Sequence, residues 1–483
     1  MSNEQGIYVE IGTGFSFHPE PAKACREAIL KALENLGRYD PSVCFIFAAQ
    51  RYATGEVPST VTRLLGQIPV LGCTTAGEIL NEPKKGSLSV VLIASPFLDV
   101  VGVWGAEGAN RDYKKALRSI FSQGDLEGLL KDDYRRELRR SGKSIFGVMF
   151  TAGTTRSADT RAYEIFTSLR EATSFEIPFF GGCAGNAPGE RDENSVFVGN
   201  RVIADGVAVA IFETSLRHGM GMYHGFVPQD RSLMVTRVKG HEILELNGKP
   251  VMEVLPSLLG MPVSRLTEIS VSALARKALG VKTREQRYQV IPMTYLTDRG
   301  TLRVAQPVSE GTALSLMIPG PDVEHVGEHA ASMALWRANI RRPAVLFMFS
   351  CALVHVMMGQ DLRNSEVECV RNMVGSCPVV GFYSFGEQGV ARDGSNVACH
   401  GAVSCLALGN ELTDAALTYL ENRLLAEKLE IQTEKLKEAV RDWENTFNNA
   451  PFGIMVVDKD FVVRRMNRTL RNLLPPPPPR RWG

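Results

Sequence analysis

The chain has 483 residues, and its charges nearly cancel: 54 lysines and arginines stand against 53 aspartates and glutamates, for a net charge of +1. With 44% hydrophobic and 22% charged residues, the composition is that of a soluble globular protein and excludes a disordered or fibrous chain. A neutral balance gives no electrostatic reason to expect a nucleic acid or an anionic membrane as the main partner. The length predicts two to four domains, at roughly 150 residues per domain.

The nine cysteines form no Cys-x-x-Cys pair and no zinc-ligand spacing, so no metal site is predicted. Several lie in apolar runs, as Cys44 does, which is typical of reduced thiols in a cytosolic interior. The N-terminus shows no basic segment followed by an apolar core, the mark of a secretory signal. The least polar stretch, 343–359, is shorter than the roughly 20 residues that span a bilayer. We expect a soluble, cytoplasmic protein.

One pattern of residues occurs three times along the chain. Each copy opens with an apolar run rich in β-branched and aromatic residues, at 43–49, 145–151 and 345–350. A helix-compatible segment follows, and a Pro-led apolar pair then runs into a glycine-rich turn, at 72–78, 181–186 and 381–387. A glycine opens one further strand in each copy, at Gly86, Gly206 and Gly401. Continuous apolar runs suit strands buried on both faces, so the pattern predicts an α/β core of strand–helix–strand–turn–strand units.

The three turns end in polar side chains, which are Glu78, Asn186 and Glu387. Closely spaced glycines allow tight turns and close approach of the backbone to another group. A loop at a strand end of an α/β scaffold is where ligands usually bind. Two interpretations stay open: the polar side chains line a common ligand site, or the glycines serve close packing and the acids are solvated caps.

Two different segments separate the copies. Residues 107–143 are charge-rich with interleaved acids, and we expect an exposed helical insertion there rather than a nucleic-acid-binding arm. Residues 218–319 include an alternating stretch at 233–238 that is typical of a β-hairpin. We therefore predict two core domains, at residues 7–214 and 215–409.

The character of the sequence changes after Gly409. Residues 412–447 contain no glycine or proline, and apolar residues recur at three- and four-residue steps. The skip at Leu424 and Leu425, and Gln432 on the seam, indicate a coiled coil that is not perfectly regular. We expect residues 410–447 to form a parallel dimeric connector; a single amphipathic helix folded back on the core is the alternative.

Residues 445–467 resemble the opening of a PAS domain, in which a helix leads into a hairpin and an asparagine starts the next helix. Only about thirty residues of this pattern are present, too few to bury a core of their own. We expect residues 448–474 to be the start of a truncated or frameshifted PAS domain. Residues 475–483 begin with five prolines and are expected to form a stiff, disordered tail.

The turns at 72–79 and 381–387, together with matching stretches at 179–185, 224–226 and 349–351, make the chain resemble a FIST protein with N-terminal and C-terminal FIST domains. The resemblance covers about residues 7–408. It implies an intracellular sensor module that binds a small ligand such as an amino acid, beside a PAS, histidine-kinase, cyclic-dinucleotide or chemotaxis output domain. His400 is followed by Gly401 where the family often has asparagine, and no output domain is present in this sequence.

An amino-acid ligand would need both charges matched. Carboxylates at Glu78 and Glu387 would hold its ammonium, and Arg156, with backbone amides near Thr154 and Thr155, would hold its carboxylate. The alternative is that Arg156 and Glu78 only satisfy each other. The predicted ligand-binding residues are Cys73, Thr74, Thr75, Glu78, Thr154, Thr155, Arg156, Cys183, Asn186, Cys351, Tyr383 and Glu387.

Two other functions stay open. Some FIST proteins are haem-based nitric oxide sensors, and a haem would need His355 or His400 as an axial ligand in an apolar pocket. A cysteine-dependent enzyme would use Cys73, Cys183 or Cys351, whose thiols stand in or near the glycine turns. No base follows from the spacing, and the turn at 72–78 lacks the Lys-Ser/Thr of a phosphate-binding loop. We therefore predict no catalytic residue and no cofactor in the favoured case.

Overall fold

The computed structural model describes residues 6–475 except 125, 127, 156–157, 188–189, 263–265, 267–273, 275–276, 283–287 and 359. The described chain forms two compact units, Met1–Ala416 and Leu417–Gly483. The predicted tail beyond Pro475 lies outside the described residues.

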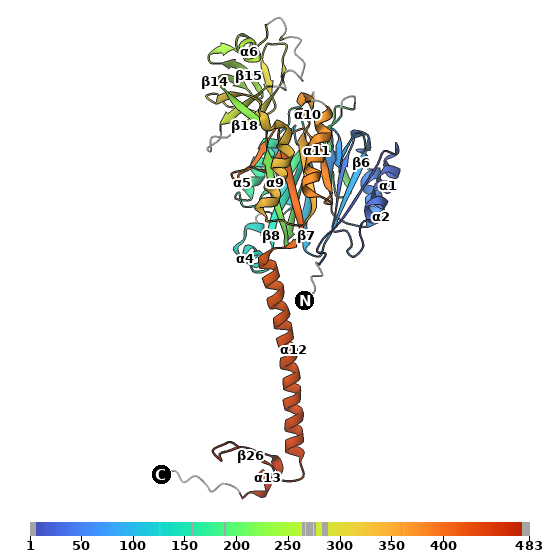
Figure 1. Cartoon of the computed structure of the whole chain (residues 1–483), viewed down its shortest axis with the longest axis vertical. Coiled ribbons are helices and arrows are strands. Elements are labelled where there is room, and N and C mark those ends of the chain that lie inside the picture. Colours follow the sequence, from blue (N-terminus) through green and yellow to red (C-terminus); the bar gives the residue numbers. More distant parts are fainter. Residues whose placement is uncertain are drawn as a thin grey trace. The chain divides into compact units, whose positions relative to one another are not determined.

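Three six-stranded sheets build most of the first unit (Figure 1). The first contains, in spatial order, β1 (Glu10–Ser16), β6 (Leu88–Ala94), β2 (Val43–Ala48), β3 (Val70–Thr74), β10 (Ser195–Val198) and β11 (Arg201–Ala204). The second contains β24 (Asn396–Cys399), β23 (Glu387–Val390), β9 (Phe179–Ala184), β8 (Ser144–Ala152), β12 (Gly206–Thr214) and β7 (Leu98–Glu107). The third contains β13 (Leu216–Tyr223), β25 (Val403–Leu412), β21 (Pro343–Cys351), β22 (Val379–Ser384), β4 (Glu78–Leu80) and β5 (Pro83–Lys84).

Helices cover one face of each of these sheets. The first sheet packs against α1 (Pro21–Leu33) and α2 (Glu56–Leu65). The second packs against α3 (Tyr113–Gln123) and α5 (Ala162–Ala172), and the third against α9 (Val326–Arg337) and α11 (Gln360–Val374). The shorter helical segments are η1 (Gln50–Tyr52), η2 (Gly128–Leu130), α4 (Asp132–Arg140), η3 (Pro321–His325) and α10 (Ala352–Met358). The mixed α/β prediction is thus correct, and residues 107–143 are largely helical as expected.

The faces of the three sheets that the helices leave uncovered pack against one another through phenylalanine side chains. Phe47 of β2, Phe150 of β8 and Phe349 of β21 are fully buried, and their ring centroids are 5.6–5.8 Å apart in all three pairs. Phe382 of β22 contacts each of them, at 4.5–5.9 Å. Aromatic pairs at this separation add to the free energy gained from burial, so this cluster holds the three sheets together.

The parallel pairs β2–β3, β8–β9 and β21–β22 require a glycine at one matched position. A Cβ on Gly72 would lie 1.9 Å from the carbonyl oxygen of Ile46, its partner in the neighbouring strand. Gly181 and Gly381 stand in the same relation to Met149 and Met348, at 2.0 and 1.9 Å. Any larger residue would push these paired strands apart.

Each glycine turn carries the chain out of one sheet and into another. The hairpin β4–β5 follows β3 in the chain but pairs with β22 of the third sheet. The hairpin β10–β11 follows β9 but pairs with β3 of the first sheet, and β23–β24 follows β22 but pairs with β9 of the second. The exchange is cyclic and interlocks the three sheets, so none of these three is formed by one continuous stretch of chain.

A fourth sheet, of seven strands, lies between β13 and α9 in the sequence. It contains β14 (Phe226–Lys239), β20 (Ala313–Pro319), β17 (Ala278–Lys282), β18 (Tyr288–Leu296), β19 (Leu302–Val304), β15 (Glu242–Leu246) and β16 (Lys249–Pro250), with α6 (Val251–Leu259) packed against it. The predicted hairpin at 233–246 is present as β14–β15. The predicted domain boundary at 214 and 215 falls between β12 and β13.

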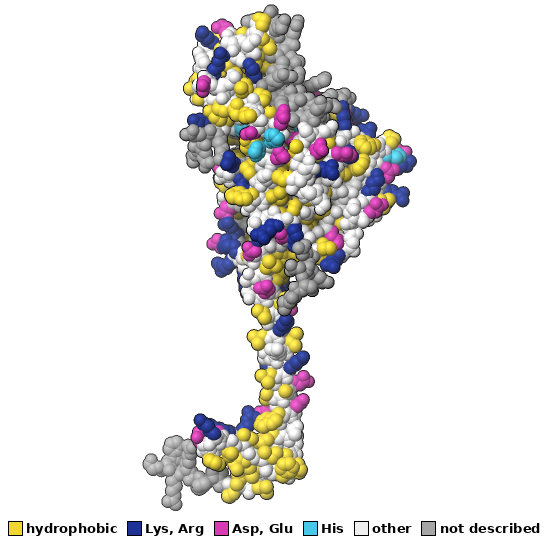
Figure 2. Space-filling model, viewed as in Figure 1, with side chains coloured by type: hydrophobic (Ala, Val, Ile, Leu, Met, Phe, Trp, Pro, Cys, Tyr) yellow, Lys and Arg dark blue, Asp and Glu magenta, His cyan; other side chains and the backbone are white. Residues whose placement is uncertain are grey.

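Helix α12 (Asp414–Asn449) begins in the first unit and continues into the second. It is followed by the hairpin of β26 (Met455–Val457) and β27 (Val463–Met466) and by α13 (Arg468–Leu473), which Asn467 caps. Figure 2 shows hydrophobic side chains exposed along this helix, and Leu425, Leu429 and Leu436 are each more than 60% exposed. None of the described helices has the length and apolar character to cross a membrane.

Candidate functional site

The three glycine turns meet at one place in the first unit. Tyr383 N donates to Gly77 O at 2.8 Å, which joins the third turn to the first. Cys183 N donates to Gly386 O at 2.8 Å, and Gly185 N donates to Thr74 O at 2.9 Å. These bonds close a ring through all three turns, so the interpretation that the turns gather at one centre is consistent with the structure.

Glu78 at this centre is fully buried and has donors from its own chain. Its carboxylate accepts hydrogen bonds from the Thr75 hydroxyl at 2.6 Å, from Ser87 N at 2.9 Å and from the Ser87 hydroxyl at 2.6 Å. Burial raises the pKa of Glu78 to about 7 despite these bonds. A carboxyl that is about half protonated at neutral pH attracts an ammonium less strongly than a fully ionised one.

Glu387 has the same surroundings in the third turn. It is fully buried, and its carboxylate accepts from the Ser384 hydroxyl and from Ala402 N. Burial raises its pKa to about 8. The role of both glutamates as ammonium ligands stays a prediction, and their bonds already account for them as buried acids with internal partners.

The predicted thiols are fully buried near the same centre. Burial raises the pKa of Cys183 to about 12 and the pKa of Cys73 and Cys351 well above the ordinary value. A nucleophilic cysteine needs a depressed pKa, so the environment of these thiols disfavours the thiolate. Tyr383 is also buried, 1% exposed, with its ring against His355.

Of the remaining predicted ligand residues, Thr74 is fully buried, Thr154, Thr155 and Asn186 are partly exposed, and one lies outside the described residues. Thr74 exchanges two hydrogen bonds with the backbone of Ser195, and the Thr154 hydroxyl accepts from Thr160 N. Asn186 donates to Arg191 O at 2.7 Å. Arg156 lies outside the described residues.

The two histidines considered for haem are buried among protein groups. His355 Nε2 lies 2.9 Å from the Ser350 hydroxyl and 3.3 Å from a Glu366 carboxylate oxygen. His400 is buried beside Gly386 and Cys183, and burial lowers its pKa to about 4. A haem needs an apolar pocket with an open axial position. Both histidines are packed against other protein groups, and the haem alternative stays a prediction.

Two polar clefts open instead where the first and second strand pairs end. The first cleft has a volume of about 610 Å³ and is lined by Gln50, Arg51, Ala53, Thr54, Gly55, Glu190, Arg191, Glu193, Ser195, Val202 and Ala204. The second, also about 610 Å³, is lined by Asn110, Arg111, Ala152, Thr155, Ala158, Arg191, Asp192, Glu193, Asn194, Ala204 and Asp205. Both volumes lie in the range of small-molecule sites. Because Arg191, Glu193 and Ala204 line both, the clefts adjoin.

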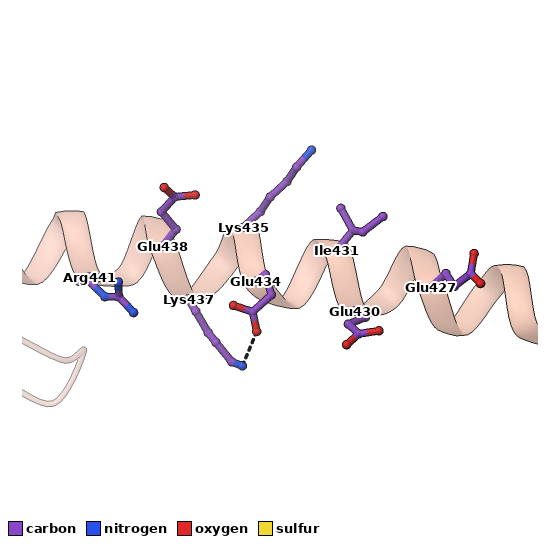
Figure 3. Close-up of a pocket in the computed structure, with 8 residues that line it drawn as sticks. All are labelled: Glu427, Glu430, Ile431, Glu434, Lys435, Lys437, Glu438 and Arg441. Atoms are coloured by element: carbon purple, nitrogen blue, oxygen red, sulfur yellow. Dashed lines mark hydrogen bonds and ion pairs between the residues drawn. The ribbon is translucent and has the colours of Figure 1, made fainter.

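A third concave surface lies on helix α12 (Figure 3). Its eight side chains all come from this one helix and are mostly charged, with Glu434 and Lys437 paired at 2.7 Å. No other described element closes it, so it is an open helix face rather than a site for a small molecule. Among the described residues, no group of three or more His, Cys, Asp or Glu side chains is placed to hold a metal ion.

Comparison with protein families matches the FIST N domain at residues 42–249 and the FIST C domain at residues 252–390. The chain is a FIST-domain protein. FIST domains are small-ligand sensor domains in signalling proteins, and the two matches include both clefts and the ring of glycine turns.

No curated protein matches this FIST-domain chain. Among solved structures, a cyanuric acid hydrolase from A. caulinodans is 8% identical with a TM-score of 0.23, over 42% of this chain and 71% of that one. PurLQS from Thermotoga maritima is 10% identical with a TM-score of 0.20, over 83% of this chain and 73% of that one. Likeness at these TM-scores supports no conclusion about fold or function.

Sequence reasoning found Thr155 of the second cleft but missed Gln50 and Asn194. Gln50 is the first polar residue after the buried run of β2, at a strand end where ligands usually bind, and that position was the available signal. Asn194 had no comparable signal, because it lies in the polar stretch 190–195, where every residue type suits a solvated loop.

Proposed function

We propose that this protein senses an amino acid or a similar small metabolite and relays its binding through helix α12 to an output module of the PAS or histidine-kinase type. The observation that carries the proposal is that the first turn of α12 is built into the FIST unit. The Thr413 hydroxyl accepts from Ala416 N at 3.1 Å and donates to Gly142 O at 2.9 Å. Arg217 of β13 pairs with Asp414 at 2.7 Å.

This anchoring supports a mechanical relay. A ligand changes a protein by favouring one of two conformations, and it needs a bistable element to pass that change on. Since α12 is one uninterrupted helix of 36 residues, a small displacement of the strands that hold Thr413 and Asp414 would move the whole helix. A rotation or a shift of register of this helix is the signal we propose.

The proposed partner of α12 is a second copy of the same chain. Its exposed leucines would be covered in a parallel coiled coil, in which the same positions of two copies face each other. The hairpin β26–β27 and α13 supply the start of the PAS module that this interpretation places after the connector. We also interpret the three glycine-turn sheets as copies of one strand–helix–strand repeat, since they share one strand order and one glycine position.

We propose ligand binding rather than catalysis for the FIST unit. The raised pKa of its buried thiols supports this choice, because thiolate chemistry would be suppressed at neutral pH.

The ligand part of the proposal is tested by thermal unfolding of the full chain with a panel of amino acids and related metabolites. A compound at a hundredfold excess over its Kd should stabilise the fold by about 2.7 kcal/mol, a shift of a few degrees in Tm. A panel without any shift would contradict the proposed ligand class.

The relay part is tested by sedimentation of the Leu429→Glu/Leu436→Glu double variant. We expect the wild type to be a dimer and the variant a monomer that keeps the ligand-induced shift in Tm. The Glu438→Lys variant, which reverses a charge on the opposite side of the same helix, is the matched control and should remain dimeric. A monomeric wild type would exclude α12 as a dimer connector.

A further inference from the structure

The two clefts share a wall that comes from the second glycine turn. After β9, residues 190–195 run between the clefts and then enter β10. The first cleft is closed on its other side by η1 and Thr54, which follow β2, and the second by Thr155 and Ala158, which follow β8. Both are therefore formed at the carboxyl ends of buried strands, where α/β folds usually place ligand sites.

Three polar atoms in these clefts have no hydrogen-bond partner among the described residues. They are Gln50 Oε1 and Thr54 Oγ1 in the first cleft and Asn194 Oδ1 in the second. Gln50 is only 8% exposed and Asn194 only 2%. A buried polar atom without a partner costs stability, so folded proteins rarely leave one unless something else supplies the bond. Three such atoms in adjoining clefts point to a ligand that donates hydrogen bonds.

The charged side chains narrow the chemistry of that ligand. Arg51 is already used, because its guanidinium donates to Gly86 O and to the Tyr52 hydroxyl. Arg111 is paired with Asp205 at 3.0 Å. Arg191 and Glu193, which line both clefts, make no side-chain hydrogen bond or ion pair with the residues that the structure describes. Glu190 of the first cleft accepts from Ala187 N at 2.8 Å. The Glu193 carboxylate and the Arg191 guanidinium are therefore the charged groups of the first cleft that have no side-chain hydrogen bond or ion pair among the described residues.

We infer that the paired clefts are the ligand site of this sensor and that they bind a compound with a primary ammonium group. The ammonium has three N–H donors for the acceptors at Gln50, Thr54 and Glu193, which all line the first cleft. The Arg191 guanidinium fits a carboxylate in its two-pronged geometry, so an α-amino acid matches the site better than a simple amine. This inference rests on the proposed sensor function and adds to it the site and the recognised group.

The inference makes an unusual prediction about stability without ligand. Replacing an unpaired buried polar group by an apolar one of similar shape removes a cost of folding. Gln50→Met and Thr54→Val, which remove the unpaired oxygens of the first cleft, should therefore unfold at the same temperature as the wild type or higher. A structural role for either group would instead lower Tm.

The test measures Tm of the full chain with amino acids, with their N-acetyl derivatives and with the corresponding amines. We expect amino acids to raise Tm, the amines to do so less, and N-acetylation to abolish the effect. For the best compound, Gln50→Met and Thr54→Val should each weaken Kd by about tenfold or more, as expected for a lost hydrogen bond to a charged group. Asn35→Leu, which removes an exposed amide just after α1, should bind as the wild type does.

The possible failures are distinguishable. If a compound shifts Tm equally in the wild type and in both cleft variants, or if its N-acetyl form binds as well, the inferred site or chemistry is wrong while the sensor function stands. If no compound shifts Tm of the wild type, the proposed ligand class fails together with the inference. A lower Tm of both variants without ligand would also overturn the inference, since the Gln50 and Thr54 side chains would then have structural partners.

Discussion

The first and third glycine turns differ from the second at one register position. Glu78 of β4 and Glu387 of β23 each pair with the residue that follows the turn glycine of a neighbouring strand, which is Phe382 or Gly182. In the second turn the same position, opposite Cys73, is Val196 of β10. The first and third turns thus bury a carboxyl at the position where the second turn buries an isopropyl group.

The hydroxyl groups that donate hydrogen bonds to the carboxyl differ between the turns in the same way. The hydroxyl donors Thr75 and Ser384 stand three residues after their turn glycines, and Ala184 stands at that place in the second turn. A buried acid and its hydroxyl are thus present together or absent together, as expected when an unpaired buried group is costly. The second turn lacks this pair and is followed by a longer polar stretch, residues 190–195, which lines both clefts. The comparison supports different roles for the turns: the first and third stabilise the core, and the second lines the proposed ligand site.

The largest effect tests whether the three turns are equivalent in the core. Gly181→Ala would place a Cβ 2.0 Å from the Met149 carbonyl oxygen, and this strand pair cannot move without disturbing the phenylalanine cluster. We expect a loss of stability above about 4 kcal/mol, which would leave little folded protein. The measurement is the yield of folded protein and its Tm, for Gly72→Ala and Gly381→Ala as well.

Gly55→Ala is the control, because a Cβ there has no atom within 4 Å. It should unfold within about 0.5 kcal/mol of the wild type. Normal stability of any one of the three turn variants would show that its turn is less tightly packed than the others.

The next prediction concerns a substitution that places a carboxyl in the second turn. Val196 is fully buried, and Val196→Glu would introduce a carboxyl without the hydroxyl that serves Glu78 and Glu387. We expect a loss of about 3–5 kcal/mol in the free energy of unfolding at pH 8, measured with urea. Val196→Thr controls for the change of shape and should cost about 1 kcal/mol.

Adding the donor should recover part of this loss. In the Ala184→Ser/Val196→Glu double variant, we expect about 1–2 kcal/mol of favourable coupling between the new hydroxyl and the new carboxyl. Additive effects of the two substitutions would mean that the second turn does not share the geometry of the other two.

The strands that hold these turns were predictable, but their exchange between sheets was not. The runs at 43–49, 145–151 and 345–350 are apolar enough to be identified as buried strands, and they are β2, β8 and β21. Nothing local indicates that the hairpin after β3 pairs with β22 rather than with its own sheet, since strand pairing over some 300 residues depends on the assembled core.

The sequence predicted the location of the candidate site better than its chemistry. The turns do meet, but a glutamate after a glycine turn looks the same in sequence whether it faces a ligand or the core. A local signal for burial was present: Thr75 and Ser384 each stand three residues before the glutamate that they bind. At that spacing the hydroxyl and the acid bond each other within one turn, without a group from outside it.

The last prediction depends on pH and concerns variants that remove the ionisable carboxyls from the first and third turns. In the unfolded chain Glu78 and Glu387 titrate near the ordinary glutamate pKa of 4.5, and in the folded chain their pKa values are about 7 and about 8. Between these values the folded state binds more protons than the unfolded state, so the stability of the wild type falls as pH rises from about 4.5 to about 8. Glu78→Gln and Glu387→Gln keep an acceptor and cannot ionise, so each should remove its share of this decline.

Relative to the wild type, each variant should therefore gain stability between pH 5 and pH 9, by up to about 3 kcal/mol for a shift of this size. Urea unfolding at pH 5, 7 and 9 measures the gain. Glu171→Gln, the same change on an exposed face of α5, should show no such trend. If the stability difference between the buried variants and the wild type does not change with pH, the two carboxyls are not the desolvated acids that distinguish the first and third turns from the second.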